Sequence, residues 1–147
     1  GAVEIVAYAS VNDIGRIVSP AIVRGQLEGG AVQGIGQALC EAVRYDRETG
    51  QLLSASFMDY ALPRADVLPS IRSECDETQP CRHNPLGAKG IAEGNCMSVP
   101  ACIANAIADA LGVVDVQLPA TPRRIHAMMA AEEAPPPADL MRAGAGR

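Results

Sequence analysis

The amino-acid sequence predicts one α+β domain over residues 1–131 and a disordered tail over residues 132–147. A chain of 147 residues is long enough for one sizeable core and short for two. A β-branched run near the start predicts a strand, and apolar residues at helical spacing follow two hydroxyl–proline pairs. The end is rich in proline, alanine and glycine, and it holds too little apolar side chain to offset the entropy of ordering.

The first half of the chain predicts a strand, a turn and a long helix. The apolar run at residues 3–8 is typical of a buried strand, and residues 12–15 have the composition of a turn. Ser19 and Pro20 supply an N-cap residue followed by proline at the first helical position. Apolar residues then recur with a period of about 3.6, so the helix is expected to run to Val43.

The second half predicts a hairpin, a strand and two helices around one glycine-rich loop. Residues 45–52 predict a hairpin with a glycine in its turn, and residues 71–75 predict another strand. Residues 84–94 hold three glycines and predict a loop with unusual backbone angles. Helices are expected at residues 100–111, where a glycine follows, and at residues 122–131, behind a second cap–proline pair.

Charge and composition argue against several function classes. A formal net charge of −5 disfavours a protein that binds nucleic acid through counterion release. The longest apolar stretch, residues 99–114, contains Asn105 and Asp109 and is shorter than a bilayer span, so no membrane insertion is expected. The five cysteines show no C-x-x-C pair, which indicates reduced thiols in a cytoplasmic protein. The two histidines lie far apart in the sequence, so no metal ligated by protein side chains is expected.

The predicted first helix carries an unusual number of glycines. The helical glycines are Gly25, Gly29, Gly30, Gly34 and Gly36. Each glycine costs roughly 0.8–1 kcal/mol of helix propensity relative to alanine. On a helix, the side chain of Gln33 would stand among Gly29, Gly30 and Gly36, where a flat polar ligand could reach both the amide and bare backbone. The alternative is tight packing of the helix against a sheet or another helix, which spacing alone favours without excluding a ligand.

A lone carboxylate, Glu93, lies in the glycine-rich loop. A carboxylate held there can act as a general base, and Gly87, Gly90 and Gly94 are expected to offer it backbone N–H groups. The alternative is a solvated loop acid paired with Lys89, an interaction of little energetic value at a surface. Three further acids are assigned structural roles: Asp13, Glu28 and Asp59.

Read in order, three segments resemble one known family. They are Asn-Asp-Ile-Gly-Arg with the glycine-rich helix after it (12–39), Asn-Pro-Leu-Gly-Ala-Lys-Gly-Ile-Ala-Glu (84–93), and Thr-Pro-Arg-Arg-Ile (121–125). Together they resemble the closing region of molybdenum hydroxylase large subunits, the family of xanthine dehydrogenase, aldehyde oxidase and aerobic carbon monoxide dehydrogenase. The resemblance covers residues 3–130 and implies part of a C-terminal molybdopterin-binding domain.

The resemblance also implies roles for individual residues. Glu93 occupies the position of the family's catalytic base, and Gln33 that of the glutamine that hydrogen-bonds the cofactor, which is molybdopterin or molybdopterin cytosine dinucleotide. Further cofactor-binding residues are implied at Gly34, Lys89, Gly90, Ile91 and Ala92. Two departures stand beside the base: Ala92 replaces a usual glycine, and Gly94-Asn95-Cys96 replaces a commoner small or proline-containing sequence.

The implied activity is hydroxylation of an aldehyde, an N-heterocycle or a related electron-poor carbon in a small-molecule substrate, with water as the oxygen source. Iron–sulfur clusters and FAD are expected on partner subunits or domains, beside the remaining portion of the large subunit. Because family subunits are several times longer, the 147-residue chain alone is expected to be inactive. One alternative stays open, in which the chain is an accessory or truncated structural subunit without a cofactor.

Overall fold

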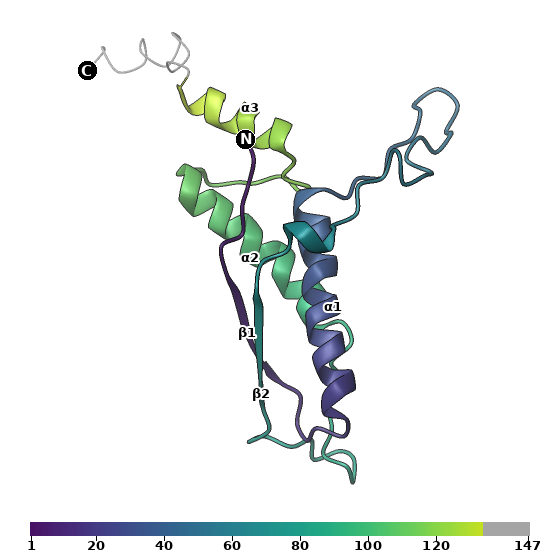
Figure 1. Cartoon of the computed structure of the whole chain (residues 1–147), viewed down its shortest axis with the longest axis vertical. Coiled ribbons are helices and arrows are strands. Elements are labelled where there is room, and N and C mark those ends of the chain that lie inside the picture. The colour runs from purple at the N-terminus through teal and green to yellow at the C-terminus, as the bar shows by residue number, and fades with distance from the viewer. Residues whose placement is uncertain (134–147) are drawn as a thin grey trace, which may run out of the picture.

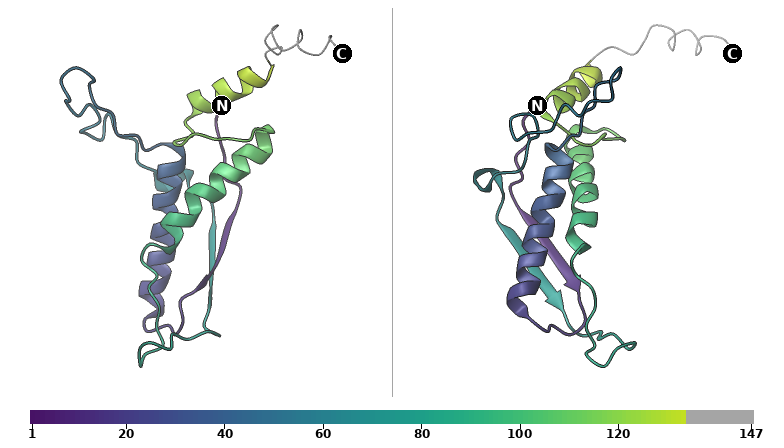
Figure 2. Two further views of the ribbon diagram at one scale, coloured as in Figure 1. Left: turned by 180° about the vertical axis from the view of Figure 1, so that it is seen from behind. Right: turned by 90° about the vertical axis from the view of Figure 1, so that its right-hand side faces the viewer.

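The computed structural model describes residues 1–133, so nearly all of the predicted tail at 132–147 lies outside the described residues. The elements, in chain order, are β1 (Tyr8–Asp13), α1 (Pro20–Leu39), the short 3₁₀ helix η1 (Ala65–Val67), β2 (Ile71–Asp76), α2 (Gly94–Leu111) and α3 (Pro122–Glu133). The helices α1 and α2 pack along each other beside a two-stranded sheet, and α3 lies across the end of α2 (Figures 1 and 2). No helix within residues 1–133 is long and apolar enough to cross a membrane.

The sheet is parallel, and β1 begins later than the sequence predicts. Pairing runs from Tyr8↔Ile71 to Asp13↔Asp76. The predicted strand at 3–8 is therefore wrong except for its last residue. The physical reason lies in the partner strand, because Pro69 precedes β2 and has no N–H with which to extend the ladder backwards. The predicted turn at 12–15 is correspondingly shifted, since it falls at Gly15, whose φ is +60°.

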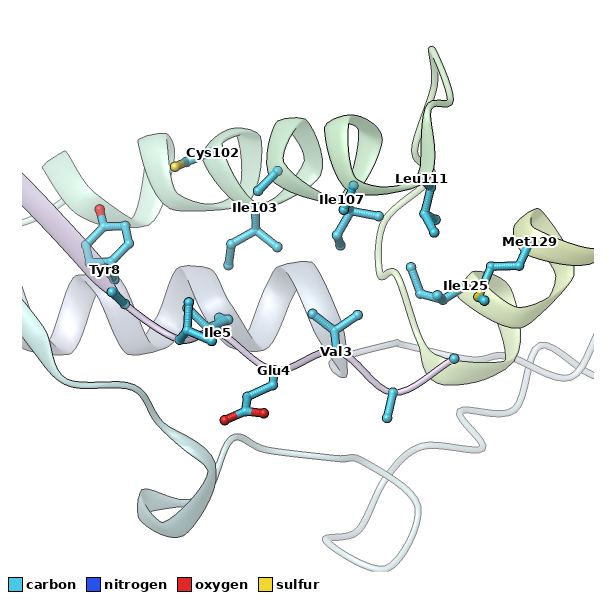
Figure 3. Close-up of a pocket in the computed structure, with 16 residues that line it drawn as sticks. Val3, Glu4, Ile5, Tyr8, Cys102, Ile103, Ile107, Leu111, Ile125 and Met129 are labelled. Atoms are coloured by element: carbon cyan, nitrogen blue, oxygen red, sulfur yellow. The ribbon is translucent and has the colours of Figure 1, made fainter. Parts of the chain in front are cut away.

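Residues 1–7 run as an extended segment along α2 and α3. Figure 3 shows Val3 and Ile5 pointing towards Ile107 and Ile103 of α2, whereas Glu4 points away. The segment and the two helices line an apolar groove of about 500 Å³. The alternation of side chains is that of a strand, but the contacts come from helices instead of a neighbouring strand.

The two long helices begin and end by different devices. Ser19 precedes α1 and Pro20 lies in its first turn, as predicted. The helix ends at Leu39 instead of Val43, because the amides of both Cys40 and Glu41 donate to the Gly36 carbonyl, at 3.0 and 2.8 Å. The end of α2 is as predicted, with the following Gly112 in the left-handed region at φ 69°.

The predicted start of α2 at Pro100 is wrong. The helix begins six residues earlier, at Gly94, and Pro100 lies inside it. The proline ring is accommodated at the contact with α1, where a Cβ on Gly34 would come within 3.1 Å of Pro100 Cδ. The start matters for function, because it makes Glu93 the residue that caps α2 instead of one several residues ahead of it.

The remaining predictions place short elements close to where the structure has them. Residues 45–52 form an arm that projects from the helices, closed by an antiparallel bridge between Tyr45 and Leu52 and a turn at Gly50, with φ +71° (Figure 1). The strand at 71–75 is confirmed and extends to Asp76, and the last helix begins at Pro122 as predicted and ends at Glu133. The core lies between α1, α2 and α3. Its buried residues are Ala31, Ile35, Ala38, Val99, Ile103, Ile107, Ala120 and Ile125.

Candidate functional site

The loop that carries Glu93 is fastened to the end of β1. The Arg16 amide and the Cys81 amide both donate to the Gly87 carbonyl at 2.9 Å, and the Lys89 amide donates to the Ile14 carbonyl at 2.9 Å. Gly87 has a φ of +70°, so this loop glycine has the unusual backbone angle that the sequence predicts, and Gly90 and Gly94 do not. The first resembling segment (12–39) and the second (84–93) are thus in direct contact, although they are distant in the sequence.

Lys89 pairs with Asp13, so the predicted alternative of a Lys89–Glu93 pair is wrong. Lys89 Nζ lies 2.6 Å from Asp13 Oδ2. The other carboxylate oxygen of Asp13 accepts the Gly15 amide at 3.1 Å. The hydrogen bond from Lys89 and then that from the Gly15 amide hold the pKa of Asp13 below its usual value. The structural role assigned to Asp13 is therefore specific, because it fixes the loop to the turn after β1.

Glu93 is exposed and caps α2. Its backbone carbonyl accepts the Met97 amide at 3.3 Å, and its side chain makes no capping hydrogen bond. The amides of Gly87 and Gly94 donate to the carbonyls of Asn84 and Ile91, so the prediction that these two amides serve the Glu93 carboxylate is wrong. What the fold provides is the start of an 18-residue helix, next to which negative charge is stabilised.

The five glycines of α1 have three kinds of surroundings. A Cβ on Gly34 would lie 2.6 Å from Val99 Cβ, and one on Gly30 would lie 3.3 Å from Asn95 Cβ. These two glycines, both buried, permit the close approach of α2. At Gly25 and Gly29, in contrast, a Cβ would meet nothing within 4 Å. At Gly36 a Cβ would meet the Glu41 carboxylate and would lie 2.9 Å from Pro63 Cδ. The packing interpretation is therefore supported at Gly30, Gly34 and Gly36, and the ligand interpretation stays a prediction for the open positions.

Gln33 lies on the side of α1 that α2 leaves uncovered. Its side chain is exposed, one turn after Gly29 and Gly30. A Cβ placed on Gly30 would lie 3.4 Å from the Cys96 nitrogen. The first turn of α2 therefore contacts α1 at Gly30. Glu93 immediately precedes that first turn, and Gln33 lies three residues after Gly30 on α1.

The other predicted site residues occupy different environments. Gly34 is buried between the helices, Lys89 and Ile91 are half-buried, and Ala92 and Gly90 are exposed. Lys89 and Ile91 also line a pocket of about 250 Å³. Its other lining residues are Ile14, Arg16, Val18, Ser19, Ile22, Val23 and Ala88.

Comparison with known proteins identifies the family. Residues 1–69 match the molybdopterin cofactor-binding domain. The large subunit of nicotine 6-hydroxylase from Paenarthrobacter nicotinovorans is 43% identical over 128 residues, which are 85% of this chain and 15% of that protein. The chain belongs to the family of molybdenum hydroxylase large subunits. The family predicted from the three sequence segments is confirmed.

Two further members of the molybdenum hydroxylase family agree. Subunit gamma of the 6-hydroxypseudooxynicotine dehydrogenase complex of the same organism is 42% identical over 127 residues, 85% of this chain and 16% of that protein. The crystal structure of quinoline 2-oxidoreductase from Pseudomonas putida 86 matches with a TM-score of 0.80 and 38% identity, over 90% of this chain and 17% of that one. The predicted mixed α and β fold, as part of a molybdenum-binding subunit, is confirmed. The chain spans about one sixth of the length of these relatives.

The exposed residues of the site fit a large polar cofactor. Gln33 is exposed one turn after Gly29. A Cβ placed on Gly29 or on Gly90 would meet nothing within 4 Å, so the backbone at both positions is open. Within the described residues, no group of three or more His, Cys, Asp or Glu side chains is placed to hold a metal ion. A metal held by the dithiolene of a molybdopterin needs no such group, so the side chains present are compatible with that cofactor.

Sequence reasoning missed one residue of this region, Asn95. It is 2% exposed and donates a hydrogen bond from Nδ2 to the Leu27 carbonyl of α1 at 2.8 Å. A signal was present, since Asn95 precedes Val99 and Ile103 by four and eight residues and so lies on the buried face of α2. Starting the helix at Pro100 removed Asn95 from that pattern.

Proposed function

We propose that this chain forms one wall of the active site of a molybdopterin-dependent hydroxylase, with Glu93 as the general base. The reaction is oxidation of an aldehyde, an N-heterocycle or a related electron-poor carbon with water as the source of oxygen. The supporting observation is the placement of an exposed carboxylate at the start of α2, on a loop fastened to β1, where the first turn of α2 contacts α1 at Gly30.

In this proposal the chain's own residues handle a proton and orient the cofactor. Bound cofactor, as molybdopterin or molybdopterin cytosine dinucleotide, supplies the acceptor for two electrons. The Glu93 carboxylate accepts one of the two protons lost when a C–H bond and water become a C–OH group. The Gln33 amide hydrogen-bonds the cofactor, and the open backbone at Gly29 and Gly90 allows close approach. Gly34, Lys89, Ile91 and Ala92 remain proposed cofactor neighbours, the first two with packing and ion-pair roles as well.

The relatives suggest which substrate class to test first. Two of them are named for nicotine and quinoline, both of which contain an N-heterocycle. We therefore place N-heterocycles ahead of aldehydes. Electrons would leave through iron–sulfur clusters and FAD on partner subunits. The names of two relatives, a subunit of a complex and a large subunit, support the presence of partner subunits. The free thiols of all five cysteines are typical of a reducing compartment, which supports a cytoplasmic enzyme.

Glu93→Gln tests the base directly. In the assembled enzyme we expect this variant to keep its fold and molybdenum content and to lose turnover, because an amide cannot accept the proton. Glu48→Gln is the matched control, since Glu48 is exposed on the projecting arm. Turnover of Glu93→Gln equal to that of the control would contradict the assignment.

The accessory alternative predicts a different result in a separate measurement. A structural subunit without a cofactor would contain no molybdenum when purified with its native partners. Stoichiometric molybdenum and extractable pterin in that preparation would support the enzyme, and their absence would support the accessory subunit.

A further inference from the structure

Asn95 is the buried polar side chain at the crossing of the two long helices. It is among the largest side chains that are fully buried, together with Leu27 and Val99. Within residues 1–133, its bond to the Leu27 carbonyl is the one side-chain hydrogen bond in fully buried surroundings, and it joins residues 68 positions apart. A buried amide of this kind is costly to leave unpaired, so the bond fixes one arrangement of the two helices.

The helix contact around Asn95 is built in two layers. In the first layer Asn95 and the Cys96 backbone lie against Gly30, and in the second layer Val99 lies against Gly34. Both layers bury apolar atoms, but Asn95 alone adds a directional bond to a main-chain oxygen of α1. Rotation or sliding of the first turn of α2 would break that hydrogen bond before it separated Val99 from Gly34.

Glu93 lies between Asn95 and a second set of anchors. On the other side, the Lys89 amide bonds the Ile14 carbonyl at 2.9 Å and the Lys89 ammonium pairs with Asp13. Between these anchors Gly90, Ala92 and Glu93 are exposed, whereas Ile91 and Gly94 are half-buried and joined by a hydrogen bond. Losing either anchor would leave the carboxylate attached from one side.

We propose that Asn95 is a positioning residue, which sets the location of the Glu93 carboxylate relative to the Gln33 face of α1. The inference rests on the proposed role of Glu93 as base. It also accounts for the departure at residues 94–96, since the asparagine there supplies a tether that a smaller residue would lack. Misplacement of a catalytic group by about 1 Å can cost on the order of 100-fold in rate, so one tether two residues away has a measurable effect.

The experiment compares Asn95→Ala with Val99→Ala in the assembled enzyme. Both variants remove buried atoms from the same helix contact, and only the first removes the bond to Leu27. Hydrogen exchange of the amides at residues 91–97 is measured first, because it does not depend on turnover. We expect faster exchange there in Asn95→Ala than in Val99→Ala. If Asn95→Ala does not assemble, Asn95→Ser, which shortens the side chain less, takes its place.

Kinetics then separate positioning from packing. We expect Asn95→Ala to lower kcat by about 10-fold or more at unchanged molybdenum content, with KM within about twofold of the parent. Equal loss of kcat in Asn95→Ala and Val99→Ala, or unchanged exchange in Asn95→Ala, would overturn the proposal. Full turnover in Glu93→Gln would instead overturn the proposed function, and the exchange comparison would then decide whether Asn95 anchors the loop.

Discussion

Two glycines of α1, one turn and a residue apart, should respond oppositely to the same substitution. Alanine gains about 0.8–1 kcal/mol of helix propensity at either site. At Gly29 the added Cβ meets nothing within 4 Å, so Gly29→Ala should stabilise the cofactor-free protein by up to about 1 kcal/mol. At Gly34 the Cβ would lie 2.6 Å from Val99 Cβ and 2.9 Å from its Cγ1.

An overlap of that size belongs near the upper end of the cost of overpacking, which is about 1–3 kcal/mol. Neither atom can yield easily, because Val99 is fully buried and Pro100 flanks it. After the propensity gain, Gly34→Ala should destabilise by about 2 kcal/mol, so the two variants should differ by about 3 kcal/mol.

The assay is urea unfolding of the cofactor-free assembly, followed by far-UV circular dichroism, with the parent and both variants measured side by side. Cofactor retention is measured separately, and there Gly29→Ala should be the variant that loses molybdenum, if its open face receives the cofactor. Equal free energies of unfolding for the two variants, or stabilisation by Gly34→Ala, would refute the division of the glycines into a packing pair and an open pair.

Three further outcomes are expected. Gln33→Ala should lower cofactor retention or turnover with little change in melting temperature, because the Gln33 side chain is exposed. A small gain in stability with full turnover would show that Gln33 contributes neither to cofactor retention nor to turnover. The pKa of Asp13 is held below its usual 3.8 chiefly by Lys89. The stability that the ionised Asp13 contributes is therefore complete above pH 3.8, and it is lost as the pH falls through the lower pKa of the folded state. The urea midpoints of the parent and Asp13→Asn should differ at about pH 6 and converge in acid. The 147-residue chain by itself should associate and bind no molybdenum cofactor tightly. The reasons are that Phe57 and Met58 are 84% and 93% exposed and that the sheet has two strands within the described residues. A monomer in ultracentrifugation that melts cooperatively in calorimetry and carries stoichiometric molybdenum would contradict this prediction.

Local sequence signals located most helices and turns. Ser19 and Pro20 mark the start of α1, although the Ser19 side chain makes no capping hydrogen bond, and Gly112 marks the end of α2 with its positive φ. The backbone preferences of proline and glycine are local, so the sequence reveals them. The errors arose where a distant segment decides. Residues 3–8 have the composition of a strand, yet pairing starts at Tyr8 because the partner strand begins only after Pro69. The start of α2 was misplaced because a proline that is typical of a first turn here packs over Gly34 in the interior.

The candidate site was predictable as a set of residues but not as an arrangement. The order of the three segments indicated the family, and the resemblance to that family indicated roles for Gln33 and Glu93. Nothing in their spacing indicated that Lys89 would pair with Asp13, 76 positions away, instead of Glu93 four positions away. Burial of Asn95 was equally hidden, since it depends on the depth at which α2 crosses α1.

The packing glycines and the proposed base are linked through that crossing. Gly30 and Gly34 lack the side chains that would hold α2 away, so the first turn of α2 comes close enough for Asn95 to reach the Leu27 carbonyl. Glu93 precedes this contact by two residues, and its position therefore depends on atoms that Gly30 does not have. A bulkier residue at position 30 should consequently displace Glu93 without touching it, which makes the helix contact part of the proposed catalytic geometry.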